Sequence, residues 1–202
     1  MNSEVLPDVS RETIERLEQF GALVERWTKK INLISKSSVN DIWDRHILDS
    51  VQLYHLMQES GLKVDIGSGG GFPGIVLAIL DQQSNSQVPY VLVESDARKA
   101  VFLRTAAREL DLQVDVISKR IEDIDPLNAQ WLSARALAPL EILLEYARLH
   151  LASDGAAIFP KGKFWREEEA RARNEWQFDL TPVQSRTESD AAILIIKDIV
   201  RA

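Results

Sequence analysis

The sequence predicts an α/β fold, in which an open and mostly parallel β-sheet carries helices on both faces and ends in an antiparallel pair of strands. Three observations support this prediction. A short apolar run at 63–66 leads into a glycine-rich turn and then into an apolar segment at 75–80. Strand-like and helix-like segments alternate from there to residue 176, and only SRTESD separates the last two strand-like segments. Alternation is typical of parallel strands joined by helices, and so short a connection predicts an antiparallel hairpin.

The spacing of apolar residues sets the expected bounds of the alternating elements. The expected strands after the glycine turn lie at 88–93, 114–117, 131–136, 155–159, 178–184 and 191–200. The expected helices lie at 97–110, from Pro139 through LEILLEYARLHL, and at 164–176.

The first sixty residues predict a helical extension. Ser10 is a good N-cap, and apolar residues recur every three or four positions over 14–34. A second amphipathic pattern covers about 39–57. We therefore expect two parts, a helical extension at 1–60 that packs on the sheet and a domain at 61–202 that contains the sheet.

Composition excludes several classes of protein. The chain has 202 residues, is 45% hydrophobic and 27% charged, and contains no cysteine. Disulfides, thiolate metal sites and cysteine nucleophiles are therefore excluded, and we expect no metal site. No apolar run approaches the roughly 20 residues that span a bilayer, and the first ten residues lack the pattern of a signal peptide. We expect a cytoplasmic protein without a membrane partner.

The glycine turn predicts a ligand, because four glycines within residues 67–71 exceed what a tight turn requires. One spacing fits a dinucleotide. Gly69, Gly71 and Gly74 match GxGxxG after a strand, and Glu94 follows about twenty residues later. This pattern would indicate an oxidoreductase that binds NAD.

A second spacing in the same turn fits S-adenosylmethionine (AdoMet). Asp65, Gly67, Gly69 and Gly71 read DxGxGxG, with an acid at the end of the strand. In AdoMet-dependent methyltransferases that acid lies near the amino group of the methionine part, and a second acid, here Glu94, takes the ribose hydroxyls. The closing hairpin favours this interpretation. An open parallel sheet that ends in an antiparallel pair is the architecture of class I AdoMet-dependent methyltransferases, whereas a dinucleotide fold usually repeats its βαβαβ half.

Two absences narrow the possible reactions. Methylation of pyrimidine carbon 5 requires a cysteine nucleophile, and the chain has none. The tetrad [DN]PP[YF], which prepares exocyclic amines, is replaced by SARALAP after the fourth expected strand. A nucleophile with a free lone pair, such as guanine N7, needs only alignment with the methyl group. This reasoning permits guanine but does not select it.

Several segments together resemble one family. They are IGSGGGFPG at 66–74, RHILDS at 45–50, KRIE at 119–122, SARALAPL at 133–140 and PKGK at 160–163. Together with NL at 32–33, and taken in their order along the chain, they are similar to the bacterial RsmG family, also called glucose-inhibited division protein B. The resemblance implies AdoMet-dependent methylation of N7 of a guanine in the 530 loop of 16S ribosomal RNA. We expect the RNA to be presented within the small ribosomal subunit or its assembly intermediate, and the enzyme to be a monomer.

The resemblance also implies roles for individual residues. The positions that would contact or shape the AdoMet pocket are Asp65, Gly67, Gly69, Gly71, Phe72, Glu94, Ile121, Glu122 and Arg135. The positions that would hold RNA or the guanine are Asn32, Arg45, His46, Arg120 and Lys161. No general base is implied.

Simpler explanations exist for three of these side chains. His46 and Asp49 are three residues apart, so they share a helix face and would pair. Arg120 and Arg135 would form salt bridges to a nearby acid such as Glu122 or Glu141. At the level of the whole chain, the alternatives are a methyltransferase of a protein or small molecule, an NAD-binding oxidoreductase and a non-catalytic RNA-binding module.

Overall fold

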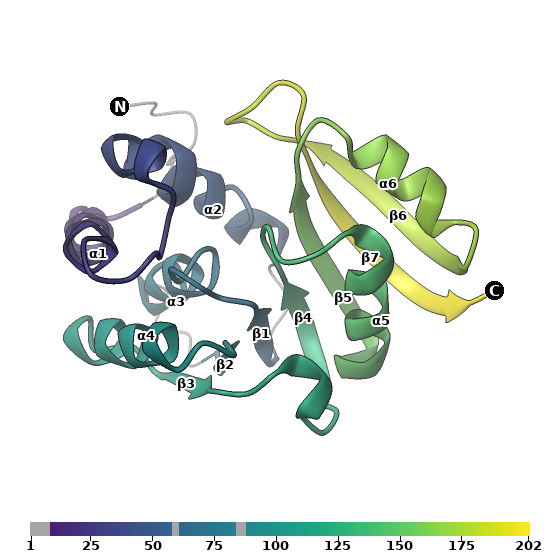
Figure 1. The fold of residues 1–202 in the computed structure, drawn as a ribbon, viewed down its shortest axis with the longest axis horizontal. Helices are drawn as coiled ribbons and strands as arrows, with labels where there is room; N and C mark the ends of the chain where they lie inside the picture. The colour runs from purple at the N-terminus through teal and green to yellow at the C-terminus, as the bar shows by residue number, and fades with distance from the viewer. Residues whose placement is uncertain (1–8, 58–60, 84–87) are drawn as a thin grey trace.

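The computed structural model describes residues 9–57, 61–83 and 88–202. These residues form a seven-stranded sheet in the order β3-β2-β1-β4-β5-β7-β6 (Figure 1). The strands are β1 Lys63–Ile66, β2 Tyr90–Val93, β3 Val114–Ile117, β4 Ala129–Ser133, β5 Leu151–Lys161, β6 Trp176–Gln184 and β7 Ala192–Arg201.

The strand directions confirm the predicted fold class. β1 lies between β2 and β4 and is parallel to both, while β3 and β5 extend the parallel part on either side. β7 is antiparallel to β6, as the short SRTESD connection predicts, and it is also antiparallel to β5. The segments that follow β1, β2, β4 and β5 therefore begin at one edge of the sheet. In parallel sheets, ligands bind at that edge.

Helices cover both faces of the sheet. The α-helices are α1 Arg11–Thr28, α2 Asp49–Val51, α3 Gly74–Gln83, α4 Ala97–Glu109, α5 Leu140–His150 and α6 Trp165–Ala172. In Figure 1, α1, α3 and α4 lie on the opposite side of the sheet from α5 and α6. None of the described helices is long and apolar enough to cross a membrane.

The N-terminal extension shares a core with the sheet domain. Leu17 and Phe20 of α1 are buried in one cluster with Ile79 of α3 and Phe102 of α4. Within the extension, α1 packs mainly on α3 and α4, which cover the sheet. Leu53 and Met57, near the end of the extension, are buried in a cluster with residues of β4 and β5, so this part of the extension packs on the sheet itself. The predicted boundary at residue 60 lies outside the described residues.

The first helix is shorter than its apolar periodicity predicts. Ser10 caps it as expected, since its hydroxyl accepts a hydrogen bond from the backbone N–H of Thr13. The helix ends at Thr28, although the periodic pattern continues to 34. Ile31 and Ile34 pack against the core from a loop, so their spacing reflects burial without helical backbone.

The second predicted helix is interrupted. Residues 39–57 do not form one α-helix: a 3-10 helix at Lys36–Asp41, a π-helix at Trp43–Leu48, α2 and a 3-10 helix at Tyr54–Leu56 follow one another. The π-helix contains Arg45 and His46. Wide turns of this kind are frequent at functional sites, because they redirect side chains that a regular helix would space differently.

The bounds of the fourth strand matter for the site. The expected strand covers 131–136, but β4 ends at Ser133 and the chain leaves the sheet there. Ala136 has a positive φ of 54°, which turns the loop. Arg135 therefore lies in a loop at the carboxyl edge of the sheet, where its side chain can reach other segments.

Candidate functional site

A glycine turn connects the carboxyl end of β1 to α3. Gly67 and Gly69 have positive φ angles of 65° and 52°, which side chains with a Cβ rarely adopt. Gly74 is required for a different reason, because an added Cβ would overlap Cδ2 of Leu92 and separate α3 from β2. The turn thus stays narrow and close to the sheet.

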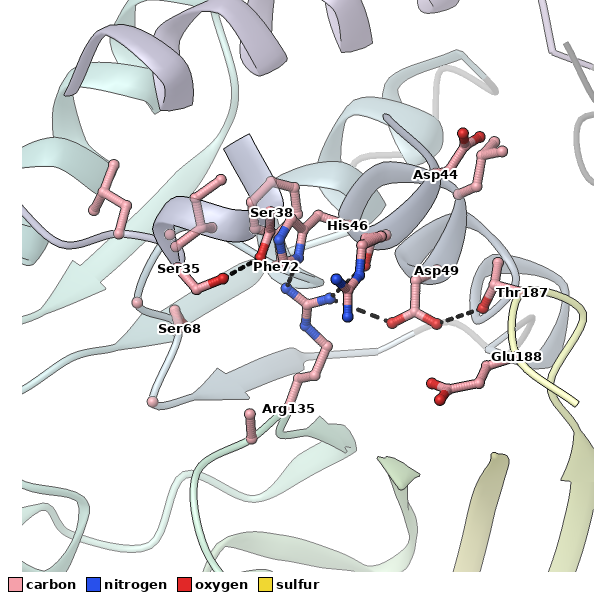
Figure 2. Close-up of a pocket in the computed structure, with 18 of the residues that line it drawn as sticks. Ser35, Ser38, Asp44, His46, Asp49, Ser68, Phe72, Arg135, Thr187 and Glu188 are labelled. Atoms are coloured by element: carbon pink, nitrogen blue, oxygen red, sulfur yellow. Dashed lines mark hydrogen bonds and ion pairs between the residues drawn. The ribbon is translucent and has the colours of Figure 1, made fainter. Parts of the chain in front are cut away.

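A cavity of ≈ 1080 Å³ lies against this turn (Figure 2). Six parts of the chain meet around it: the glycine turn, the segment after α1, the π-helix with α2, the start of α4, the loop after β4 and the tip of the β6–β7 hairpin. The lining residues include Leu33, Ser38, Arg45, His46, Asp49, Gly67, Gly69, Phe72, Lys99, Arg135, Arg186 and Thr187. Both ends of the chain therefore contribute to one cavity, whose size suits a nucleoside-like ligand.

Asp65 is buried beneath the turn with one oxygen unsatisfied. Its Oδ1 atom accepts a hydrogen bond of 2.7 Å from the hydroxyl of Ser133, the residue that pairs with it across β1 and β4. Its Oδ2 atom has no hydrogen-bond partner among the described residues. Burial raises the pKa of Asp65 to about 6. A carboxylate in this state gains from a positively charged group nearby.

Glu94 ties the turn to the end of β2. Its Oε2 atom accepts from the backbone N–H of Gly69 at 2.9 Å, and its Oε1 atom accepts from that of Asp96 at 2.8 Å. The side chain is almost fully buried. Glu94 therefore stabilises the glycine turn through its hydrogen bond to Gly69. Gly69 lines the cavity, whereas Glu94 does not.

Phe72 carries a stacked cation and a stacked imidazole. The guanidinium of Arg135 lies 5.2 Å from the Phe72 ring centroid, and the ring of His46 is stacked on Phe72 at 5.0 Å. An Arg135 nitrogen lies 2.8 Å from Nδ1 of His46. The three side chains come from the loop after β4, the glycine turn and the π-helix, and they fix one another at the cavity wall (Figure 2).

His46 is a hydrogen-bond acceptor in this arrangement. Burial is the largest cause that lowers its pKa to about 4, and the charges of Arg135 and Arg45 lower it further. The imidazole is therefore neutral at pH 7. Because an arginine only donates, Nδ1 of His46 accepts, and its proton is on Nε2. The lone pair that a general base would use is thus occupied by Arg135.

Asp49 holds Arg135 and the hairpin tip at the same time. Its Oδ2 atom lies 3.3 Å from an Arg135 nitrogen, and its Oδ1 atom accepts from the hydroxyl of Thr187 at 2.8 Å. The predicted pair of His46 and Asp49 is therefore wrong, because Arg135 lies between them. The predicted salt bridge of Arg135 is right in kind, but its partner is Asp49 instead of Glu122 or Glu141.

Gln52 completes the connection between α2 and the hairpin tip. Its amide donates to Asp49 at 2.9 Å and to Ser185 at 3.3 Å, and its carbonyl accepts from the backbone N–H of Arg186 at 2.9 Å. The hairpin tip is thus fixed over the cavity by backbone and side-chain hydrogen bonds.

A second cavity of ≈ 460 Å³ adjoins the first on the other side of Arg135. It is lined by Asp49, Arg135, Leu137, Lys161 and Gly162, among others. Lys161 is not free to bind a ligand as it stands. Its Nζ atom lies 2.7 Å from Glu168 and donates to the carbonyl of Ala138 at 2.9 Å.

Eight of the predicted site residues do not line the main cavity. Asp65, Glu94 and Lys161 are described above, and Gly71 packs against Ile75 and Phe20, which an added Cβ would meet. The other four are Asn32, Arg120, Ile121 and Glu122. Ile121 is packed in the core, and Glu122 accepts a hydrogen bond of 2.6 Å from the hydroxyl of Tyr146. Arg120 is exposed on the preceding loop. Asn32 lines a third cavity of ≈ 460 Å³, which shares Leu33, Ile34 and Ser35 with the main one. None of the four lines the main cavity.

Sequence reasoning missed Gln52 and Thr187 and gave Asp49 the wrong partner. Asp49 belongs to the RHILDS segment, which predicts a position near the site, whereas Gln52 and Thr187 belong to no motif. Their role depends on contacts across more than 130 residues, for which one sequence carries no local signal.

Solved structures share this architecture. The chain resembles TYW2 of M. jannaschii in complex with AdoMet, with a TM-score of 0.60 at 14% identity over 87% of this chain and 80% of the other. It also resembles a mutant of MtNAS in complex with S-adenosylmethionine, with a TM-score of 0.59 at 15% identity over 92% and 71% of the two chains. The fold of this chain is therefore that of the class I AdoMet-dependent methyltransferases.

Sequence comparisons identify the family. Residues 13–194 match the family model described as rRNA small subunit methyltransferase G, GidB. A ribosomal RNA small subunit methyltransferase G of Ruegeria sp. (strain TM1040) is 50% identical over 96% of this chain and 95% of its own length. One of Gluconobacter oxydans is 46% identical over 96% and 97%. The chain belongs to the rRNA small subunit methyltransferase G family, so the dinucleotide interpretation of the glycine turn is set aside.

Proposed function

We propose that this protein transfers a methyl group from AdoMet to N7 of a guanine in the 530 loop of 16S ribosomal RNA. The observation that carries the proposal is the glycine turn between Asp65 and Phe72, which forms the floor of the main cavity in a chain of this family. The relatives named above as ribosomal RNA small subunit methyltransferases support RNA as the substrate.

The residues at the turn fit AdoMet. The buried carboxylate of Asp65, whose Oδ2 atom has no hydrogen-bond partner among the described residues, suits a cationic ligand. The backbone at Gly69 leaves space that a Cβ would reduce, since the nearest atom to such a Cβ is 3.6 Å away. Phe72 and Arg135 would border the cofactor on the cavity side, and Glu94 would hold the turn in shape. When bound, AdoMet supplies the electrophilic methyl group.

The polar groups of the cavity favour a nucleophile that needs no general base. The Nδ1 lone pair of His46 is engaged by Arg135, and the Asp49 carboxylate accepts hydrogen bonds from Arg135 and Thr187. Guanine N7 already has its lone pair free, so the protein's part is to exclude water and to hold the base in line. This agrees with guanine and does not require the tetrad that is missing after β4.

Basic side chains around the cavity would hold the RNA. Arg45 of the π-helix, Lys99 of α4 and Arg186 of the hairpin tip all line it. The chain as a whole has a net charge of −7, so these cations form a local site within an acidic protein. We infer a substrate presented in a small ribosomal subunit or its assembly intermediate, where shape and proteins add to phosphate contacts. We also infer that the enzyme acts as a monomer in the bacterial cytoplasm.

The two predicted parts of the chain would bind different ligands, one the substrate and the other the cofactor. The helical extension, 1–60, would form the substrate wall of the cavity through Arg45, His46 and Asp49. The domain at 61–202 would supply the cofactor floor through the glycine turn. Arg135 would connect the two, because it contacts Phe72 on one side and Asp49 on the other.

The test is to follow the methyl group. The purified protein is given AdoMet with a labelled methyl group and either small subunits or free 16S RNA from a strain that lacks this gene. Label in the RNA, at a guanine that becomes sensitive to borohydride and aniline, is the expected result. Label only in protein or small molecules contradicts the proposal. A Gly69→Val variant serves as the control for background methylation.

A further inference from the structure

The turn between β5 and α6 presents an exposed aromatic side chain beside two cations. Phe164 keeps 60% of its surface exposed, more than any other large apolar residue that the structure describes. The Nζ atom of Lys163 lies 4.7 Å from its ring centroid. The guanidinium of Arg166 lies 4.3 Å from the ring of Trp165, which is buried. A single exposed phenylalanine is ordinary, so its neighbours and position must decide what it does.

The two cations are available to a ligand. Other basic side chains of this region are in ion pairs, namely Lys161 with Glu168, Arg171 with Glu141 and Arg173 with Glu169. In the part of the chain that the structure describes, Lys163 and Arg166 have no carboxylate partner and contact aromatic rings instead. Both side chains are exposed. They can therefore bind phosphate without first losing an ion pair.

The backbone that carries Phe164 is held at both ends. Before it, Lys161 is anchored to Glu168 and to the carbonyl of Ala138. After it, Trp165 is buried in the core that α5 and α6 share. Because the turn is fixed, an aromatic ring on it loses little conformational freedom when a ligand stacks on it.

The turn lies beside the site. It follows the carboxyl end of β5, on the same edge of the sheet as the glycine turn. Gly162, two residues before Phe164, lines the second cavity, and nothing lies within 4 Å of the place where its Cβ would be. A chain of nucleotides that enters the cavity would therefore have open access past this turn.

We propose that Phe164 is a stacking platform for an unpaired RNA base next to the methylated nucleotide, with Lys163 and Arg166 on the adjacent phosphates. The proposal rests on RNA as the substrate. Unpaired bases stack on exposed aromatic rings with little regard to sequence, while paired bases are hidden in their helix. The combination of one ring and two unpaired cations suits a nucleic acid better than an apolar protein surface.

Three variants test this proposal. Phe164→Leu keeps an apolar side chain without an aromatic face, and Phe164→Tyr keeps the face. Val200→Ala is the matched control, since Val200 is 58% exposed on β7. The measurements are the Kd for a single-stranded RNA and for a duplex RNA of equal length, the KM for 16S RNA, and the Kd for AdoMet.

Phe164→Leu should raise the Kd for single-stranded RNA and the KM for 16S RNA about 10-fold, the size expected from the loss of one stacked base. The Kd values for duplex RNA and AdoMet should not change, and Phe164→Tyr and Val200→Ala should match the wild type. A wild-type Kd for single-stranded RNA in Phe164→Leu overturns the proposal, as does an equal loss for both RNAs. If the wild type binds single-stranded RNA through Phe164 but methylates no RNA, the proposed function fails while the stacking role stands.

Discussion

Asp49 and Arg135 are 86 residues apart in the sequence, and their ion pair of 3.3 Å joins the helical extension to the loop after β4. The same carboxylate accepts a hydrogen bond from Thr187 in the C-terminal hairpin. One side chain therefore holds together three segments that surround the cavity. Arg135, in turn, stacks on Phe72 of the glycine turn. A substitution of Asp49 should therefore alter the position of Arg135, and through it the contact with Phe72 in the glycine turn.

Asp49→Asn should weaken AdoMet binding about tenfold, or about 1.4 kcal/mol, because Arg135 loses the charge that orients it. Isothermal titration with S-adenosylhomocysteine measures this directly. Thr187→Val is the control, since it removes a different hydrogen bond on the same carboxylate and leaves Arg135 in place. An unchanged affinity in a folded Asp49→Asn protein would show that Arg135 does not need its partner.

Asp65 should make stability depend on pH in an unusual direction. Burial raises its pKa from 3.8 to about 6, so the folded chain holds this proton more tightly than the unfolded chain. Stability should therefore fall as pH rises from about 4 to about 6. The difference in pKa corresponds to about 3 kcal/mol.

The Asp65→Asn variant isolates this contribution. Relative to the variant, the wild type should lose about 3 kcal/mol of unfolding free energy between pH 4 and pH 7, measured by denaturant titration without ligand. The variant should also bind S-adenosylhomocysteine poorly. Parallel stability curves for the two proteins across this range would contradict the buried charge.

Gly69 and Gly74 should respond differently to alanine. At Gly69 an added Cβ would meet no atom closer than 3.6 Å. The loss of unfolding free energy in Gly69→Ala should therefore come mainly from the φ of 52° and amount to about 1–2 kcal/mol. It should fold and lose AdoMet affinity. Gly74→Ala should unfold or express poorly, because its Cβ would overlap Leu92. Circular dichroism measures the loss of folding and ligand titration measures the loss of AdoMet affinity. If both variants lose the same property, the different roles of Gly69 and Gly74 are contradicted.

Arg45 should matter for the substrate and not for the cofactor. Its side chain is exposed at the cavity, and only its backbone carbonyl contacts Arg135. Arg45→Ala should raise the KM for RNA roughly 5-fold and reduce the slope of log K against log salt by about 1. The Kd for AdoMet should stay the same. A loss of AdoMet affinity would move Arg45 to the cofactor side.

Lys161 should matter for stability first. Lys161→Met leaves the Glu168 carboxylate without its cation in a site where both side chains are mostly buried, and it should cost about 3 kcal/mol. Adding Glu168→Gln should recover a large part of the loss. If Lys161→Met keeps the thermal midpoint of the wild type and loses only RNA affinity, the lysine is an RNA ligand after all.

Much of the fold could be predicted because its signals are local. The strand that ends at Ile66, the glycine turn and the short connection SRTESD each depend on neighbouring residues. The extension was harder, because burial alone produces the spacing of Ile31 and Ile34 in a loop. Its π-helix has no sequence signature.

The site was predicted in part for the same reason. Gly67, Gly69, Phe72, Arg45, His46 and Arg135 do meet at the cavity, as their motifs suggest. The partners of His46 and Asp49 could not be predicted, because both are set by Arg135, which arrives from a distant loop. For Lys161 the motif predicts binding of RNA, but the structure shows that its ammonium group is already paired with the Glu168 carboxylate.

The position of β7 decides when this enzyme becomes complete during its synthesis. The last strand of the chain inserts between β5 and β6, and the residues just before it close one side of the cavity. A nascent chain that has just produced the glycine turn therefore still lacks Arg135 and the hairpin tip, which line the cavity from later parts of the sequence. Activity should therefore require β7, and a chain truncated before Ala192 should show no partial activity.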